Sequence, residues 1–116
     1  MKILRLTRHT ATPEQISELA RIYGRPESPV EIVEVSETVP DAGRVKELVR
    51  EHRAVVLEAV LPMSILADLT NHKSGIEIPI IRAITKRELR EDGTKTEFIF
   101  SHYEKVIRVE VLTERL

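Results

Sequence analysis

The fold is decided by residues 2–15, which read KILRLTRHTATPEQ. The first six of these residues, KILRLT, are short and mostly apolar, as expected of one β-strand. Thr12 and Gln15 then have the spacing of a capping box, and Pro13 suits the first position of a helix. The apolar side chains that follow recur at helical spacing, at Ile16, Leu19, Ala20 and Tyr23. A strand that leads directly into a capped helix predicts the start of a βαβ unit.

The same alternation of strand and helix continues along the chain. We expect strands over residues 30–35, 54–61 and 78–84, and helices that begin near Asp41 and Pro62. Segment 54–61 is the most apolar, which predicts the central strand. Pro79 cannot donate a backbone hydrogen bond, so it should lie at the start of its strand or at an edge. Gly24 is predicted to end the first helix in a left-handed conformation.

The pattern changes after residue 84. Residues 90–94 contain an Asp-Gly turn signal, and residues 97–103 and 105–113 are predicted to be two strands with no helix between them. We therefore expect one α/β domain over residues 1–116. Its predicted fold is Rossmann-like, βαβαβαβ in two or three layers, with a C-terminal antiparallel β-β extension.

Composition excludes several classes of protein. The 18 Lys and Arg residues balance 19 Asp and Glu residues, which argues against a dedicated nucleic-acid binder. This dense, balanced charge is typical of a thermostable surface. The lack of cysteine excludes disulfides, thiolate metal sites and cysteine nucleophiles. We find no signal peptide and no apolar run long enough to span a bilayer, so we expect a cytoplasmic protein without membrane association.

Each predicted parallel strand carries one charge inside its apolar run. These four residues are Arg5, Glu34, Glu58 and Arg82. Because a lone buried charge is costly, they must pair, reach solvent or face a polar partner. The sequence leaves open whether they mark a solvent-facing side of the sheet, a charged groove or a polar dimer interface. Three short helices also leave part of the sheet uncovered, which favours a homodimer.

Ligands of open α/β sheets bind beyond the carboxyl ends of the strands. Polar and cationic side chains follow those ends and are the candidate ligand-binding residues, namely Thr7, Arg8, Thr10, Thr38, Ser64, Lys86 and Arg87. Together with neighbouring helix N-termini, such a rim would attract a phosphate- or nucleotide-like anion. Helix capping and solvation would account for the same residues. No glycine-rich phosphate loop is present, so a standard dinucleotide or P-loop site is not expected.

Two histidine segments resemble a known family. The segment 6–9, LTRH, is similar to the Arg-His-Gly opening of the histidine phosphatase superfamily, and segment 101–108 resembles that family's second histidine segment. The resemblance implies that His9 is the phosphoryl-accepting nucleophile, Arg8 a phosphate clamp and His102 a second phosphate ligand. The chain departs from the family's pattern at two glycine positions, which hold Thr10 and Tyr103.

Taken together, these patterns favour a small binding or regulatory protein that recognises an anionic ligand or a protein partner at the carboxyl edge of its sheet. The alternative is a phosphoester or phosphodiester hydrolase that uses Arg8 and His9, with His9 as the candidate catalytic residue. Such a hydrolase would be of the histidine-phosphatase type or, by fold-level analogy with small dimers that bind cyclic oligonucleotides, of a cyclic-oligonucleotide type. We expect no cofactor. We also expect no metal site, because the histidines and acidic residues lack ligand spacing.

Overall fold

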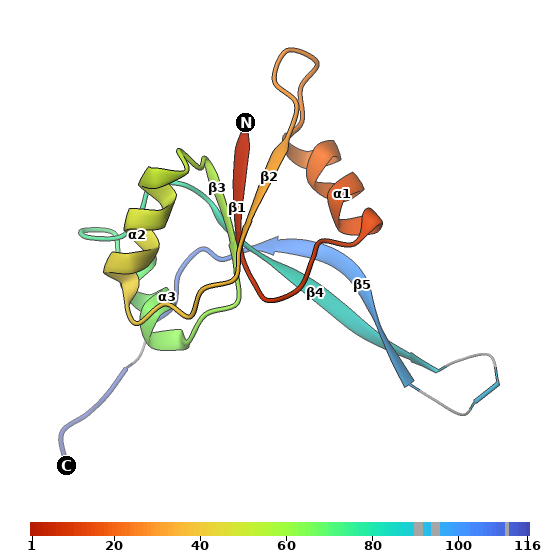
Figure 1. The fold of residues 1–116 in the computed structure, drawn as a ribbon. Coiled ribbons are helices and arrows are strands. Elements are labelled where there is room, and N and C mark those ends of the chain that lie inside the picture. The colour runs from red at the N-terminus through yellow and green to blue at the C-terminus, as the bar shows by residue number, and fades with distance from the viewer. Residues whose placement is uncertain (90–91, 94–95, 111) are drawn as a thin grey trace.

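The computed structural model describes residues 1–89, 92–93, 96–110 and 112–116. It has a mixed α/β fold with one five-stranded sheet and three helices, which confirms the predicted α/β class (Figure 1). The elements in chain order are β1 (Lys2–Leu6), α1 (Pro13–Tyr23), β2 (Glu31–Val35), α2 (Ala42–Glu51), β3 (Val56–Ala59), α3 (Met63–Leu69), β4 (Ile80–Leu89) and β5 (Thr96–Lys105).

The strands lie in the order β2-β1-β3-β4-β5. The first four are parallel, and β5 runs antiparallel to β4. The chain therefore leaves β1 toward one edge of the sheet and leaves β3 toward the other, so the strand order reverses between these two neighbours. The prediction that the third strand is central is confirmed, since all four residues of β3 are buried. Pro79 lies just before β4, as predicted, and its carbonyl accepts a hydrogen bond from the Leu57 amide at 2.9 Å.

Local capping explains where the two longer helices begin. Thr12 and Gln15 form both hydrogen bonds of the predicted capping box, and the Asp41 carboxylate accepts from the Arg44 amide at 2.9 Å. The predicted left-handed cap at Gly24 is wrong, because its φ of −68° and ψ of 145° are extended. Glycine is needed there for another reason. A Cβ atom would lie 2.4 Å from the Ala20 carbonyl oxygen, to which the Gly24 amide donates.

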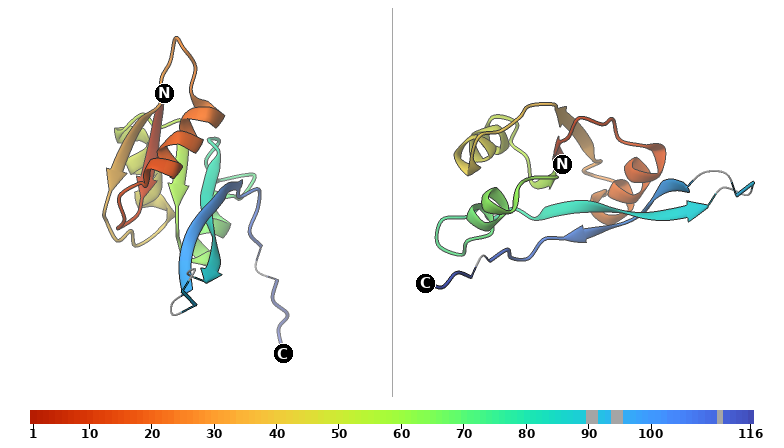
Figure 2. Two further views of the ribbon diagram at one scale, coloured as in Figure 1. Left: turned by 90° about the vertical axis from the view of Figure 1, so that its right-hand side faces the viewer. Right: turned by 90° about the horizontal axis from the view of Figure 1, so that it is seen from below.

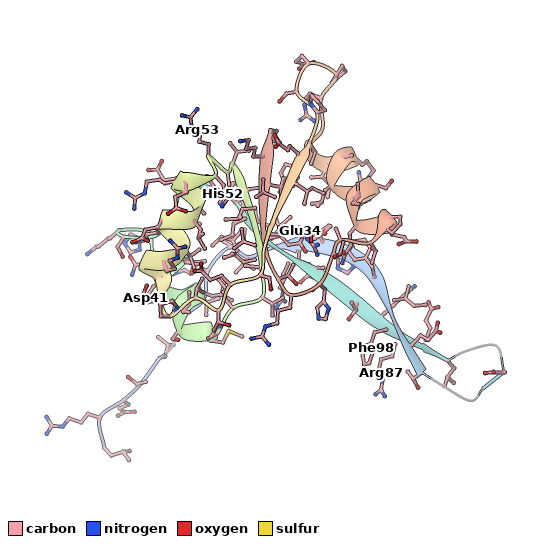
Figure 3. The ribbon with its side chains drawn as sticks, in the orientation of Figure 1. Glu34, Asp41, His52, Arg53, Arg87 and Phe98 are labelled. Carbon is pink, nitrogen blue, oxygen red and sulfur yellow. The ribbon has the colours of Figure 1, made fainter. Side chains whose placement is uncertain are left out.

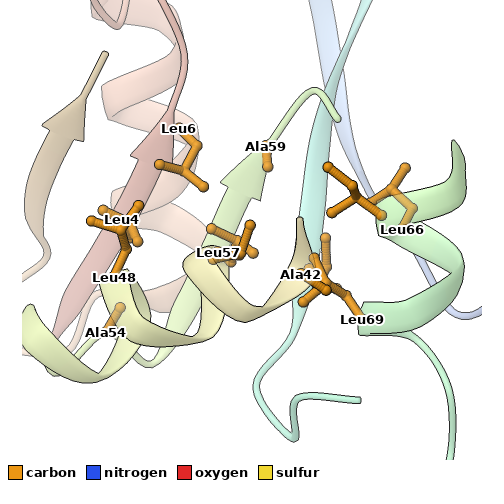
Figure 4. Close-up of a cluster of buried hydrophobic side chains, with 12 residues drawn as sticks. Leu4, Leu6, Ala42, Leu48, Ala54, Leu57, Ala59, Leu66 and Leu69 are labelled. Carbon is orange, nitrogen blue, oxygen red and sulfur yellow. The ribbon is translucent and has the colours of Figure 1, made fainter. Parts of the chain in front are cut away.

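Helices cover both faces of the sheet. Helices α2 and α3 pack on one face over the larger core cluster, which includes Leu4 and Leu57 (Figure 4). Helix α1 covers the other face, where Leu19 packs with Ile3 and Val56. Successive residues of a strand point to opposite faces. Leu4 therefore faces α2 and α3, whereas Ile3 and its neighbour on the same face, Arg5, lie on the side of α1.

The C-terminal part differs from the prediction. Strand β4 continues to Leu89 rather than ending at residue 84, because β5 pairs with residues 81–89. The second strand predicted, over residues 105–113, is wrong beyond Lys105, since residues 106–110 and 112–113 form no strand. Instead Val106 and Val109 pack against the larger core, and the Val109 amide donates to Thr70 Oγ1 at 3.0 Å. The predicted turn at 90–94 falls largely on residues 90–91 and 94, which lie outside the described residues, as does residue 111.

The outer halves of β4 and β5 form a two-stranded arm, which comprises residues 84–89 and 96–101. The arm projects away from all three helices (Figures 1 and 2). The radius of gyration is 16.1 Å, whereas a compact domain of this length has about 13 Å. The arm and the C-terminal tail account for this extension. Among the described helices, none is long and apolar enough to cross a membrane.

Candidate functional site

A pocket of about 480 Å³ opens at the carboxyl ends of β1, β2 and β3. Three segments line it, one at or after the end of each of these strands: residues 6–9, 37–39 and 60–62. The pocket therefore lies where the strand order reverses, which is the usual ligand position in an open α/β sheet. This arrangement brings together Thr7, Arg8, His9 and Thr38, four of the residues predicted from sequence.

Arg8 gives the pocket its positive charge. Its guanidinium donates a 3.2 Å hydrogen bond to Thr38 Oγ1, and no ion pair joins it to any carboxylate among the described residues. The carboxylate in the pocket, Glu37, is held by both arms of the Arg44 guanidinium at 2.7 and 2.9 Å. These hydrogen bonds to Arg44 lower the pKa of Glu37. Arg44 also contacts Glu47 and Glu51, so it offsets only part of the Glu37 charge. Arg8 is the arginine in the pocket lining that has no ion pair among the described residues, and its guanidinium is therefore available to a ligand.

His9 is exposed and lines the same pocket. Its backbone amide donates to Thr7 Oγ1 at 3.2 Å, which closes a tight turn after β1. A histidine that acts as a base or nucleophile is often oriented by a backbone carbonyl or a carboxylate on its second ring nitrogen. Among the described residues neither a carbonyl nor a carboxylate makes that contact with the His9 ring. The geometry therefore presents His9 as a surface side chain beside Arg8, without the partner that would activate it.

The remaining predicted site residues lie elsewhere. Thr10 is exposed in the loop after His9, and Ser64 lies in the first turn of α3; neither lines the pocket. The prediction that Lys86 and Arg87 follow the carboxyl end of a strand is wrong. Both lie within β4 on the arm, where Arg87 stacks over the Phe98 ring at 5.6 Å (Figure 3). Pairing with β5 extends the strand through these polar residues and carries them away from the rim.

The second histidine of the resemblance is also distant in the sheet. His102 lies on β5, where it contacts Ser101 and Glu104. Strands β3 and β4 separate β5 from β1, the strand that leads to His9. At about 4.8 Å per strand, β1 and β5 are roughly 14 Å apart. The structure thus does not bring His102 into the pocket that holds Arg8 and His9.

The four charges inside the strands form pairs. Arg5 and Glu58 are 3% and 5% exposed and make a two-pronged ion pair at 3.0 and 3.2 Å. Glu34 joins Arg5 at 3.4 Å from the edge strand β2, and its position toward α1 is visible in Figure 3. Burial excludes both a solvent-facing surface and a dimer interface for Arg5 and Glu58. Arg82 instead pairs with Glu104 on the exposed surface, at 3.2 Å.

Sequence reasoning missed the apolar side of the pocket. Val39, Val60, Leu61 and Pro62 form this wall, and the Val60 side chain is 84% exposed. In the sequence, Val60 continues the most apolar run and looks like a strand residue. It could be recognised as a surface residue only if the end of β3 at Ala59 were known. No group of histidine and acidic side chains that could hold a metal occurs among the described residues.

Comparisons with protein-family models, curated proteins and solved structures find no match to this chain.

Proposed function

We propose that this protein binds a small phosphate-bearing ligand in the pocket at the carboxyl ends of β1, β2 and β3. The observation that carries the proposal is the position of Arg8. Its guanidinium lies at the point where the strand order reverses. It donates to the Thr38 hydroxyl and forms no ion pair with a carboxylate among the described residues. A guanidinium forms strong, charge-assisted hydrogen bonds with phosphate oxygens.

The size and lining of the pocket support a ligand with two parts. A volume of about 480 Å³ suits one small molecule. Arg8, Thr7 and Thr38 offer donors for an anionic group on one side. Val60 and its apolar neighbours offer a surface for a planar or apolar group on the other. A nucleotide or a similar phosphate ester has both parts.

Binding is better supported than hydrolysis. A hydrolase of the phosphoester or phosphodiester type would use His9 as nucleophile or general base. The His9 imidazole lacks an orienting carboxylate among the described residues, and His102 lies on a distant strand. A phosphate can still bind to Arg8 and the nearby hydroxyls without either histidine. We therefore assign the pocket to recognition, by a binding or regulatory protein.

Isothermal titration calorimetry with the full chain tests the proposal. The probes are inorganic phosphate, a nucleoside monophosphate and a cyclic dinucleotide. We expect at least one to bind, and Arg8→Ala to weaken it about tenfold to a hundredfold, since a hydrogen bond to a charged group contributes about 1.5–3 kcal/mol. Arg50→Ala is the matched control, because Arg50 is an exposed arginine in the last turn of α2, away from the pocket.

The outcomes separate the alternatives. Binding that is lost in Arg8→Ala and kept in Arg50→Ala supports the site. No binding by any probe, or equal losses in both variants, overturns it. Each probe is also incubated with the protein and analysed for products by chromatography. Turnover that disappears in His9→Ala would establish the hydrolase instead.

We also propose that a second copy of the chain covers the arm. Register and ring contacts place Phe98, Phe100 and Leu89 on one face of the arm, and Leu89 and Phe98 are 74% and 71% exposed. The chain has only four aromatic residues, and three of them lie on β5. An isolated two-stranded ribbon is marginally stable in water. Arg87 lies on the same face and stacks over Phe98. A twofold axis would let two identical, largely apolar faces cover each other.

The area is sufficient for a modest interface. Burying the aromatic faces of both arms removes on the order of 1,000 Å² of surface from water, near the lower limit for a specific interface. Light scattering coupled to size-exclusion chromatography should give a dimer for the wild type, a monomer for Phe98→Ser and a dimer for Glu88→Ser, which alters the opposite face of the arm. A monomeric wild type, or a dimer that survives Phe98→Ser, contradicts this arrangement.

A further inference from the structure

The buried Arg5 uses its whole hydrogen-bonding capacity. A guanidinium has five N–H donors. Arg5 directs two of them to the Glu58 carboxylate at 3.0 and 3.2 Å. The other three go to the His9 carbonyl at 3.2 Å, to Glu34 at 3.4 Å and to Gln15 at 3.3 Å. Each donor of this one side chain therefore has an acceptor.

Two of these acceptors also hold the loop between β1 and α1. The Glu34 oxygen that pairs with Arg5 accepts a second hydrogen bond from the Ala11 amide at 3.1 Å. The Gln15 oxygen likewise accepts from the Thr12 amide at 3.0 Å. With the His9 carbonyl, three positions of the loop are thus connected to a single guanidinium. This loop begins directly after Leu6 and carries the pocket residues Arg8 and His9.

The cluster is anchored on its far side as well. The Tyr103 hydroxyl donates to the Glu58 oxygen at 2.8 Å. Burial, and then hydrogen bonding to Glu58, raises the pKa of Tyr103, so this hydroxyl stays protonated and remains a donor. Burial lowers the pKa of Arg5, but hydrogen bonding to Glu58 and the nearby negative charges outweigh it, and Arg5 stays charged. Both groups that donate to Glu58, Arg5 and Tyr103, therefore keep their protons.

Stability alone does not account for such a cluster. Replacing a buried ion pair by apolar residues of similar volume is often neutral or stabilising. The neighbouring positions on the same face of the sheet are already apolar, namely Ile3, Val56 and Ile81. Unlike an apolar side chain, the guanidinium offers hydrogen-bond donors in fixed directions. Three of these donors connect, directly or through Glu34 and Gln15, to the backbone of the loop that lines the pocket.

We propose that Arg5 is the positioning residue of the ligand pocket. Three of its five hydrogen bonds, to the His9 carbonyl, Glu34 and Gln15, set the path of residues 9–12, and that path directs Arg8 and His9 into the pocket. Lysine cannot replace it, because an ammonium group has three donors and no planar fork. This inference rests on the proposed phosphate site for its consequence in binding, but the ordering of the loop can be measured without any ligand.

The test compares two kinds of destabilised variant. Arg5→Lys keeps the charge and loses two donors. Glu34→Ala removes the acceptor of the Ala11 amide at the partly exposed end of the cluster. In this variant Arg5 is still paired with Glu58, so it serves as the test if Arg5→Lys fails to fold. Val45→Ala is the matched control, since Val45 is fully buried in the core cluster on the opposite face of the sheet from Arg5. The readouts are amide hydrogen exchange at Ala11 and Thr12, and the dissociation constant for inorganic phosphate.

We expect Glu34→Ala to speed exchange at Ala11 about tenfold or more, because it removes the acceptor of that amide. We expect Arg5→Lys to speed exchange at one or both amides about tenfold or more, because Glu34 and Gln15 lose the guanidinium that holds them in place. Both variants should also weaken phosphate binding, whereas Val45→Ala lowers the melting temperature without either change. Unchanged exchange in the cluster variants, or the same changes in Val45→Ala, overturns the positioning role. If wild-type protein does not bind phosphate, the proposed function fails and the exchange data still decide whether Arg5 orders the loop.

Discussion

Glu58→Gln is the sharpest test of the buried charge cluster. The substitution keeps the shape of the side chain and removes its charge, which leaves Arg5 without its two-pronged carboxylate partner. Removing one member of a buried ion pair costs about 3–5 kcal/mol, because the other charge remains buried and uncompensated. The lower end of this range applies here, since Glu34 still contacts Arg5 and a third of the Glu34 side chain is exposed. We therefore expect a loss of about 3 kcal/mol in the free energy of unfolding.

The assay is urea denaturation followed by circular dichroism, with thermal melting as a second measure. For a domain of this size, 3 kcal/mol corresponds to a decrease in melting temperature of roughly 10–20 °C. The double variant Arg5→Met/Glu58→Leu removes both charges and should be more stable than Glu58→Gln. A change of less than about 1 kcal/mol in Glu58→Gln would show that Arg5 and Glu58 behave as a solvated pair, and would refute the reasoning.

Three further outcomes follow from the same structure. Thr12→Ala removes one side of the capping box of α1 and should cost about 1 kcal/mol of stability, measured by urea denaturation; no loss would mean that the cap is not formed. Leu4→Ala leaves a cavity in the larger core and should cost about 2–5 kcal/mol, whereas a cost below 1 kcal/mol would mean that the site collapses around the smaller residue. Tyr103 has a raised pKa in the folded state, so its contribution to stability is complete below pH 10 and decreases as the pH rises above that value. Thermal melting between pH 8 and pH 11 should therefore show a steeper alkaline decline for wild type than for Tyr103→Phe, and equal slopes would contradict the assignment.

The expectations of a cytoplasmic location and of thermostability stay predictions. One structural feature agrees with thermostability: Arg44 forms ion pairs with Glu37, Glu47 and Glu51. Networks of surface charges of this kind contribute more at high temperature than isolated pairs do at 25 °C. A melting temperature above 80 °C would agree with the prediction, and one near 50 °C would contradict it.

Local patterns were enough to predict β1, α1 and the helix that begins after Asp41. Their signals are short-range: an apolar run, a capping hydroxyl three residues from its partner amide, and a helical repeat of apolar side chains. Gly24 was predicted as a cap for the wrong reason. Its lack of a Cβ atom matters because the helix backbone passes close to it, and sequence alone carries no such distance.

The chain order of the elements from β1 to β4, the N-terminal caps of α1 and α2 and the residues that follow β1, β2 and β3 were determined by sequence alone, because neighbouring residues decide them. The strand order was decided only in three dimensions, by packing between segments far apart in the chain. That order joins the ends of β1, β2 and β3 into one pocket around Arg8. It also gives Arg5 its partner 53 residues away and carries Arg87 out onto the arm. A charge inside an apolar strand indicates that the charged side chain needs a partner. Only the folded sheet determines which partner is within reach.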